Sequence, residues 1–249
     1  MNIFEKFWSP VKKEEKQEVK EVKIGERRSP IPSPEERILV SDKPKSEKKL
    51  GRGLTEASFV EMGEAGAGIF KEEGYQNERA AYIVDRFFNF ELVPITVIRN
   101  IGGRMGSLQQ FIPDACIGDE VENKKINQEK LKEMRFFDFL ICNTDRYGGN
   151  YLIKDNEIFA IDHHFSFWQG ISGSSGYNEI LGKKIPHRIR NEITRFSEWE
   201  EGRLILDSFL KELLGEKNVA SFWKRFECLA ACVKKGKFLN RKEFDKLKV

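Results

Sequence analysis

The sequence predicts an α+β fold with two lobes: a small β-rich lobe over about residues 50–113 and a mainly helical lobe over about residues 114–249. Three observations support this prediction. Apolar runs typical of strands dominate the first region, helical periodicity dominates residues 188–239, and a group of polar residues lies between the two. The chain has 249 residues, of which 39% are hydrophobic, so it is long enough to bury the core of one such domain.

Residues 1–49 differ in composition from the rest of the chain. Residues 10–49 are dense in Lys, Glu, Ser and Pro and poor in apolar side chains, so they cannot bury enough surface to offset the entropy of ordering them. We therefore predict a disordered, charged tail over residues 1–49. Within it, apolar residues from Ile3 to Trp8 recur at helical spacing. They predict either a segment that binds a partner or the protein's own surface, or a weakly ordered terminus.

Charge, hydropathy and cysteine spacing exclude several classes of protein. The net charge of +3 comes from the tail and the rest of the chain is balanced, so we expect no nucleic-acid binding by the domain. No apolar run approaches the ~18 residues of a membrane-spanning helix. The N-terminus is too short and too mixed in character for a secretory signal. The four cysteines lack the spacing of a zinc site, so reduced thiols and a cytoplasmic location are expected.

The first lobe is expected to run strand, strand, helix, strand, strand. Residues 57–61 and 68–72 are short apolar runs on either side of a Gly-Ala turn, which is typical of a β-hairpin. Residues 77–88 place alanine, isoleucine, valine and phenylalanine on one face at helical spacing, so they predict a helix. Residues 93–99 and 107–112 are again β-rich in composition and predict the last two strands.

The second lobe is expected to begin with a helix over residues 128–140. Residues 151–153 and 158–161 are apolar runs around a polar turn and predict a hairpin. Gly and Ser dominate residues 170–176, which predicts a loop. The chain from residue 188 to residue 239 is largely helical by its periodicity, and no internal repeat is present.

The predicted hairpin is flanked by three polar residues whose chemistry suits phosphoryl transfer. Asp145 and Asn150 lie five apart in the turn before it, and Asp162 follows its second strand. In phosphoryl transfer, one carboxylate accepts or orients the proton of the attacking hydroxyl, and an amide oxygen and a second carboxylate hold Mg²⁺ against the phosphates. We therefore expect Asp145 to be the catalytic base or to position the acceptor hydroxyl, and Asn150 and Asp162 to bind the metal. Ordinary turn chemistry is the alternative, because Asp and Asn are common in turns.

A lysine and a glutamate in the first lobe complete this set. Lys71 ends an apolar run, and Glu78 lies seven residues later at the start of the predicted helix. A lysine at a strand end can neutralise the phosphates of ATP while a helical carboxylate holds it; a weakly coupled, exposed pair is the alternative. Residues 51–58, which include Ser58, are candidates for backbone contact with phosphate, because the glycines at 63–68 fit a hairpin turn. The motif of a P-loop ATPase is absent.

Two other polar segments allow more than one interpretation. His163 and His164 follow Asp162, and adjacent residues of an extended segment point to opposite sides. We therefore expect at most one of them to face the site, and no metal-binding histidine pair. The basic stretch from Lys183 to Arg190 is expected either to recognise an acidic or phosphorylated substrate or to be a solvated surface.

With these residues identified, the chain resembles the phosphatidylinositol 3-/4-kinase-like branch of the protein-kinase-like superfamily, in particular its small bacterial members. The likeness spans about residues 55–170 and is carried by the order and spacing of six segments: 69–71, 77–82, 92–96, 106–111, 143–150 and 161–163. It implies a bilobal protein-kinase-like fold that binds ATP and Mg²⁺, with the residues above in the roles already given. It also implies that Gln110, Phe111 and Ile112 form the hinge between the lobes against adenine.

The resemblance leaves the acceptor open. The His-Arg-Asp and Asp-Phe-Gly strings of protein kinases are absent, and the helical half carries no matching motif. The expected function is a cytoplasmic, Mg²⁺-dependent ATP phosphotransferase that acts on protein Ser/Thr hydroxyls. The alternatives are a lipid kinase that uses the basic stretch and an inactive nucleotide-binding regulatory module. Self-phosphorylation is expected at accessible serines: Ser29, Ser33, Ser166, Ser172, Ser174 and Ser175.

Overall fold

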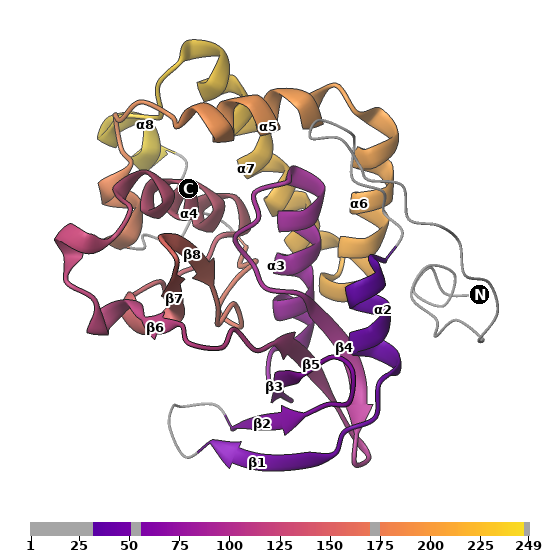
Figure 1. Cartoon of the computed structure of the whole chain (residues 1–249). Coiled ribbons are helices and arrows are strands. Elements are labelled where there is room, and N and C mark those ends of the chain that lie inside the picture. The colour runs from indigo at the N-terminus through magenta and orange to yellow at the C-terminus, as the bar shows by residue number, and fades with distance from the viewer. Residues whose placement is uncertain (1–31, 51–55, 170–174, 247–249) are drawn as a thin grey trace.

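A computed structural model has the predicted α+β architecture, with a β-sheet lobe and a helical lobe (Figure 1). It describes residues 32–50, 56–169 and 175–246. Within these ranges, no helix combines the length and the apolar character needed to cross a membrane. Most of the predicted tail, with the apolar segment from Ile3 to Trp8, lies outside the described residues.

The first lobe is a five-stranded antiparallel sheet in the order β1-β2-β3-β5-β4. Its strands are β1 (Ser46–Leu50), β2 (Ala57–Glu61), β3 (Ala67–Lys71), β4 (Thr96–Ile101) and β5 (Arg104–Gln110). The predicted hairpin of β2 and β3 is confirmed, and the Met62 N–H donates to the Gly66 carbonyl oxygen across its turn at 2.8 Å. β4 begins later than predicted, after Pro94, because proline has no N–H to donate to a strand ladder.

The sheet has two different faces because successive side chains of a strand point to opposite sides. Val60, Phe70 and Leu108 are buried on one face and form a core with Leu39, which lies ahead of β1. Lys71 is next to Phe70 in β3 and therefore points to the other face, where it is only partly buried. Lys71 contacts Asp162 of the second lobe, so the end of β3 places Lys71 between the lobes.

The folded lobe begins earlier than predicted, with α2 (Pro34–Ser41) and β1. The prediction of disorder is wrong for these two elements. Ser33 starts α2 with a capping box: its Oγ accepts from the Glu36 N–H at 3.2 Å, and its own N–H donates to the Glu36 carboxylate at 3.0 Å. Arg99 of β4 donates to the carbonyl oxygens of Leu39 and Asp42, both at 2.7 Å. Composition misled the prediction because a few specific contacts, rather than a high apolar content, order this segment.

Glu36 anchors α2 to α3 (Tyr75–Phe88). Its carboxylate is fully buried and pairs with Arg79 at 3.3 Å and with Arg86, both on α3. Arg79 also donates to the carbonyl oxygen of Thr96 in β4. A buried charge is tolerated only when it is paired and hydrogen-bonded. The carboxylate and the two guanidinium groups therefore hold α2, α3 and β4 together as one unit.

Glu36→Gln is expected to lower the free energy of unfolding by about 3 kcal/mol or more, because it leaves buried Arg79 without a full counter-charge. Glu35→Gln is the matched control. Glu35 is exposed on the same helix, so its replacement should change stability by no more than ~0.5 kcal/mol. Urea unfolding followed by circular dichroism measures both values. Equal unfolding free energies for the two variants would contradict the anchoring role of Glu36.

α3 runs from the sheet lobe into the helical lobe (Figure 1). The predicted helix over residues 77–88 is confirmed, with an earlier start at Tyr75. Near its end, Phe87 stacks on Trp199 with ring centroids 5.7 Å apart, and Phe88 meets Phe196 at 4.2 Å. Both partners lie in the helical lobe, so the C-terminal half of α3 is part of that lobe's core.

The second lobe is mainly helical, as predicted. Its helices are α4 (Gln128–Ile141), α5 (His187–Ser197), α6 (Glu200–Leu214), α7 (Glu216–Lys235) and α8 (Arg241–Asp245). A three-stranded antiparallel sheet accompanies them in the order β6-β7-β8. Its strands are β6 (Cys116–Ile117), β7 (Tyr151–Lys154) and β8 (Glu157–Ala160). Short 3₁₀ helices complete the lobe: Gly118–Glu120, Asn123–Lys125, Gly148–Asn150 and Ser175–Glu179. The predicted first helix and the predicted hairpin are confirmed as α4 and as β7 with β8.

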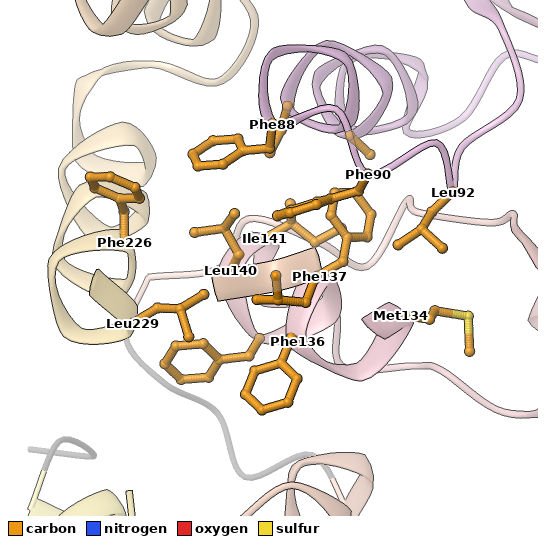
Figure 2. Close-up of a cluster of buried hydrophobic side chains, with 14 of the residues drawn as sticks. Phe88, Phe90, Leu92, Met134, Phe136, Phe137, Leu140, Ile141, Phe226 and Leu229 are labelled. Carbon is orange, nitrogen blue, oxygen red and sulfur yellow. The ribbon is translucent and has the colours of Figure 1, made fainter. Parts of the chain in front are cut away.

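One hydrophobic core holds the helical lobe together. Figure 2 shows Phe88 of α3, Phe137 and Leu140 of α4, and Phe226 of α7 gathered in this core. α4 lies among the other elements, and its residues from Glu133 to Ile141 are all buried. Full burial of a large apolar side chain contributes about 1.5–3 kcal/mol. α4 is therefore a rigid support for the polar turn that follows it.

Candidate active site

Lys71, Glu78 and Asp162 meet between the lobes. The Lys71 Nζ lies 3.2 Å from Oε1 of Glu78 and 3.0 Å from Oδ1 of Asp162. Each side chain comes from a different element: Lys71 ends β3, Glu78 lies in the first turn of α3, and Asp162 follows β8. The structure thus brings together three residues that the sequence singled out, and their catalytic roles stay predictions.

Burial and ion pairing act in opposite directions on these groups. Burial alone would lower the pKa of Lys71, but Glu78 and Asp162 raise it above its ordinary value of 10.5. Burial alone would raise the pKa of Glu78, but Lys71 and His163 hold it below its ordinary 4.5. Burial would also raise the pKa of Asp162, but the charge of Lys71 lowers it, and the pKa lies below its ordinary 3.8. All three groups are therefore charged at neutral pH.

This ion pairing predicts a loss of stability in acid. The folded pKa values of Glu78 and Asp162 lie below their unfolded values. Their contribution to stability is therefore present above about pH 5 and is lost as the pH falls toward the folded values. Lys71→Met is expected to raise both pKa values and to move the midpoint of acid unfolding to higher pH, as measured by circular dichroism. Lys49→Met, in an exposed pair with Glu56, should leave the midpoint unchanged. No shift in Lys71→Met would refute the pairing.

Asp145 and Asn150 lie in the turn between α4 and β7. The Asn150 amide nitrogen donates to the Asp145 carbonyl oxygen at 2.7 Å and lies 3.3 Å from its carboxylate. On the other side, the Asp145 N–H donates to Oδ1 of Asn143 at 3.1 Å. The carbonyl oxygen of Asn150 accepts from the Ile161 N–H at 3.1 Å. Because Asp162 is the next residue, this bond places Asn150 beside Asp162.

A buried ion pair that the sequence analysis missed supports this turn. Arg146 donates to the Asp138 carboxylate of α4 at 3.0–3.1 Å, and both side chains are 1% exposed. Its Nη1 donates to the carbonyl oxygens of Asn150 and, at 2.6 Å, Ile161. One guanidinium thus ties α4 to both sides of the β7–β8 hairpin. The signal for it was Asp138 itself, because a carboxylate within a buried apolar helix requires a partner.

His163 and His164 both contact residues of this site, so the expectation that at most one would do so is wrong. Nδ1 of His163 lies 3.3 Å from Oε2 of Glu78, and Nδ1 of His164 lies 2.6 Å from Oδ1 of Asp162. The expectation assumed an extended segment, but Asp162 has a φ of 59° and a turn follows it. A residue in the left-handed region redirects the chain, so the two histidines reach different members of the site.

Gln110, Phe111 and Ile112 lie where the chain leaves β5 for the second lobe. The Phe111 ring is partly exposed and meets Phe59 of β2 edge-on, with ring centroids 5.2 Å apart. Gln110 lines a small cavity together with Leu39 of α2, and it pairs with Gly68, so its side chain lies on the same face as Leu108. It therefore points away from the face that carries Lys71, so a contact of Gln110 with adenine would have to use its backbone.

The Ser58 side chain does not share the face of Lys71, and its predicted backbone contact with phosphate stays a prediction. Ser58 lies in β2, between β1 and β3, where it pairs with Lys49 on one side and with Phe70 on the other. Its side chain is buried and hydrogen-bonds Glu47. Ala57 pairs with Lys71, and the next residue of a strand points to the opposite face, so the Ser58 side chain lies on the face of Phe70. The Ser58 backbone is part of the hydrogen-bonded sheet. The remaining candidates at residues 51–55 lie outside the described residues.

The structure tests some of the other predicted substrate features. Ser166 is buried, so it is not the accessible self-substrate that the sequence predicted. Ser33 caps α2, whereas Ser29, Ser172 and Ser174 lie outside the described residues. In the basic stretch, Lys184 forms a β-bridge with Lys237 after α7. This bridge joins the backbone of the stretch to the segment after α7, and the Lys183 and Lys184 side chains stay exposed.

Asp162 and Asn150 supply the donor types that a hard divalent cation prefers. Lys71 and His164 both contact Oδ1 of the Asp162 carboxylate. The amide nitrogen of Asn150 faces Asp145, which turns its amide oxygen the other way. In the described part of the chain, no three His, Cys, Asp or Glu side chains form a metal-binding group. The residues fit a cation that completes its shell with ligand oxygens, as Mg²⁺ does with substrate phosphates.

Sequence similarity to known proteins covers only part of the chain. No family model matches the chain. Protein Rv2133c from Mycobacterium tuberculosis is 28% identical over an alignment that covers 34% of this chain and 44% of that protein. The chain therefore spans less than half the length of this curated relative.

Solved structures show the fold over most of the chain. Hydra Fam20, solved with a sugar, has 12% sequence identity and a TM-score of 0.54, and the likeness covers 80% of this chain and 87% of that chain. The Golgi casein kinase with Mn/ADP bound has 13% identity and a TM-score of 0.54, over 82% of this chain and 78% of that chain. The fold is therefore protein-kinase-like, as the resemblance in sequence implied.

Proposed function

We propose that the chain is a Mg²⁺-dependent ATP phosphotransferase of the phosphatidylinositol 3-/4-kinase-like type that acts on protein Ser/Thr hydroxyls. The observation that carries the proposal is the simultaneous contact of Lys71 with Glu78 and Asp162 between the lobes. A strand lysine held by a helical carboxylate is the arrangement that kinases use to bind nucleotide phosphates. The protein-kinase-like fold supports the same conclusion, and one structural neighbour is a casein kinase with Mn/ADP bound.

In this proposal, Lys71 binds the phosphates of ATP and Glu78 keeps its ammonium group in place. The raised pKa of Lys71 keeps it charged at neutral pH, as phosphate binding requires. Asp162 and Asn150 hold Mg²⁺, which when bound neutralises negative charge on the phosphates. Residues 110–112 contact adenine through the backbone.

Asp145 orients the acceptor hydroxyl and accepts its proton. Its carboxylate is exposed, so a substrate can reach it, yet Asn143 and Asn150 hold its backbone in one place. The Arg146 guanidinium bonds to backbone oxygens on both sides of the β7–β8 hairpin. Asp145 and Asp162 therefore share one rigid frame, which keeps the acceptor in line with the phosphates.

ATP binding measured by isothermal titration, with and without Mg²⁺, tests the proposal together with ATP turnover in the same buffers. We expect Mg²⁺-dependent binding and turnover in the wild type. Lys71→Met should lose both, and Lys49→Met should keep both, because Lys49 lies in an exposed pair. Binding without turnover would favour the inactive regulatory module. No binding by the wild type would overturn the proposal.

The acceptor class requires its own measurement. Intact-mass spectrometry after incubation with ATP and Mg²⁺ detects self-phosphorylation, and phosphoinositide vesicles offer a lipid hydroxyl instead. Phosphate on the lipid alone would replace the protein acceptor with a lipid one, with Lys183–Arg190 as the expected headgroup contact. The cytoplasmic location and a partner for the N-terminal tail also stay predictions.

A further inference from the structure

His163 is fully buried and sits directly after Asp162. Its Nδ1 lies 3.3 Å from Oε2 of Glu78, while Oε1 of Glu78 faces Lys71 at 3.2 Å. Glu78 is therefore held from two sides. Lys71 approaches it from the sheet, and His163 approaches it from the segment that carries Asp162.

The chemistry of this contact decides which ring nitrogen carries the proton. Glu78 is ionised, so its carboxylate only accepts hydrogen bonds and Nδ1 of His163 must donate. Nε2 is buried without a hydrogen-bond partner among the described residues.

Packing alone does not account for a histidine at this position. A buried polar nitrogen without a partner costs stability whichever protonation state it has, and an apolar side chain beside Phe137 would avoid that cost. The Nδ1 contact with Glu78 is the favourable interaction that distinguishes the imidazole from an apolar residue of similar size.

We propose that His163 is a positioning residue: its Nδ1–H group holds Glu78 toward Lys71 and so links the placement of Asp162 to the orientation of α3. This inference rests on the proposed phosphotransferase function. Asn77 strengthens the same link, because its Nδ2 donates to the carbonyl oxygens of His164 and Ser166 at 2.6 and 3.1 Å. The first turn of α3 thus contacts the segment after β8 through two side chains, Asn77 and Glu78.

Two amide replacements separate positioning from packing. His163→Asn keeps an N–H donor near the position of Nδ1, whereas His163→Gln places its donor nearer to the position of Nε2. Both put an uncharged amide into the same buried space. His163→Leu removes the donor without burying a new polar group, and it replaces the glutamine variant if that variant fails to fold.

Turnover of ATP by the full chain is expected to depend on whether residue 163 keeps an N–H donor near the position of Nδ1. His163→Asn should keep kcat within about threefold of the wild type. His163→Gln and His163→Leu should lose about 10- to 100-fold, the effect of one hydrogen bond to a charged group. Equal losses in the asparagine and glutamine variants, or wild-type kcat in the leucine variant, would overturn the proposal.

The reactivity of Lys71 gives a readout that needs no activity. An amine-reactive probe, followed by mass spectrometry, should modify Lys71 slowly in the wild type and in His163→Asn. It should modify Lys71 faster in the glutamine and leucine variants, with exposed Lys183 as internal standard. Equal rates in all four proteins would overturn the positioning role. If the wild type does not turn over ATP but Lys71 follows this order, the proposed function fails and the positioning of Glu78 stands.

Discussion

Asp162→Ala is expected to abolish the Mg²⁺-dependent part of ATP binding and to lower turnover by about 10²-fold or more. Lys71 and His164 hold the Asp162 carboxylate through Oδ1, and the backbone bond between Asn150 and Ile161 keeps it beside Asn150. The substitution removes the carboxylate, which is the charged one of the two proposed Mg²⁺ ligands, Asp162 and Asn150. Isothermal titration with ATP, in the presence and absence of Mg²⁺, measures the effect on binding.

A second substitution separates this chemistry from backbone strain. Asp162 has a φ of 59°, in the left-handed region that asparagine tolerates better than alanine. Asp162→Asn therefore removes the charge with less strain and should lose Mg²⁺-dependent binding as well. Asp155→Asn, in the β7–β8 turn with a φ of 50°, is the matched control and should bind as the wild type does. Full Mg²⁺-dependent binding by both Asp162 variants would refute the metal assignment.

Asp145→Asn is expected to keep Mg²⁺-dependent ATP binding and to lose turnover by about 10²-fold or more. The side chain is exposed and asparagine has the same shape, so stability should change by no more than ~0.5 kcal/mol. The substitution removes the carboxylate that we propose as the group that accepts the proton of the acceptor hydroxyl. Titration of ATP and a turnover assay on the same preparation separate the two effects.

The two aspartate variants should therefore behave differently from each other. Loss of ATP binding in Asp145→Asn would assign Asp145 to the nucleotide or metal rather than to the acceptor. Unchanged turnover would mean that another group accepts the proton. Asp155→Asn again serves as the control, because it makes the same chemical change on the exposed turn of the neighbouring hairpin.

The sequence predicted the arrangement around β7 and β8 well, because local spacing alone determines it. Asp145, Asn150 and Asp162 flank one short hairpin, so the turn and the two strands bring them together without help from distant residues. The Lys71–Glu78 contact is similarly local, since β3 and α3 are joined by a short turn. Patterns of this kind can be read from a single sequence.

Contacts between distant residues could not be predicted in this way. Glu36 meets Arg79 and Arg86 across a large separation in sequence, and nothing in the charged segment before β1 specifies these partners. Asp138 called for a cation, but many arginines could have supplied it. The face that the Ser58 side chain occupies could not be predicted either, because it follows only from the register with neighbouring strands.

Because α3 belongs to both lobes, an outward rotation of this helix is restricted. Swinging Glu78 outward would also pull Phe87 and Phe88 from their aromatic partners. Exposing two such rings costs at least about 3 kcal/mol, which holds the population of a swung-out state below roughly 1%. The position of Glu78, on which the proposed activity depends, is thus thermodynamically coupled to the integrity of the core. Control of activity is then expected to act through access of substrates to a preassembled site, rather than through rotation of this helix.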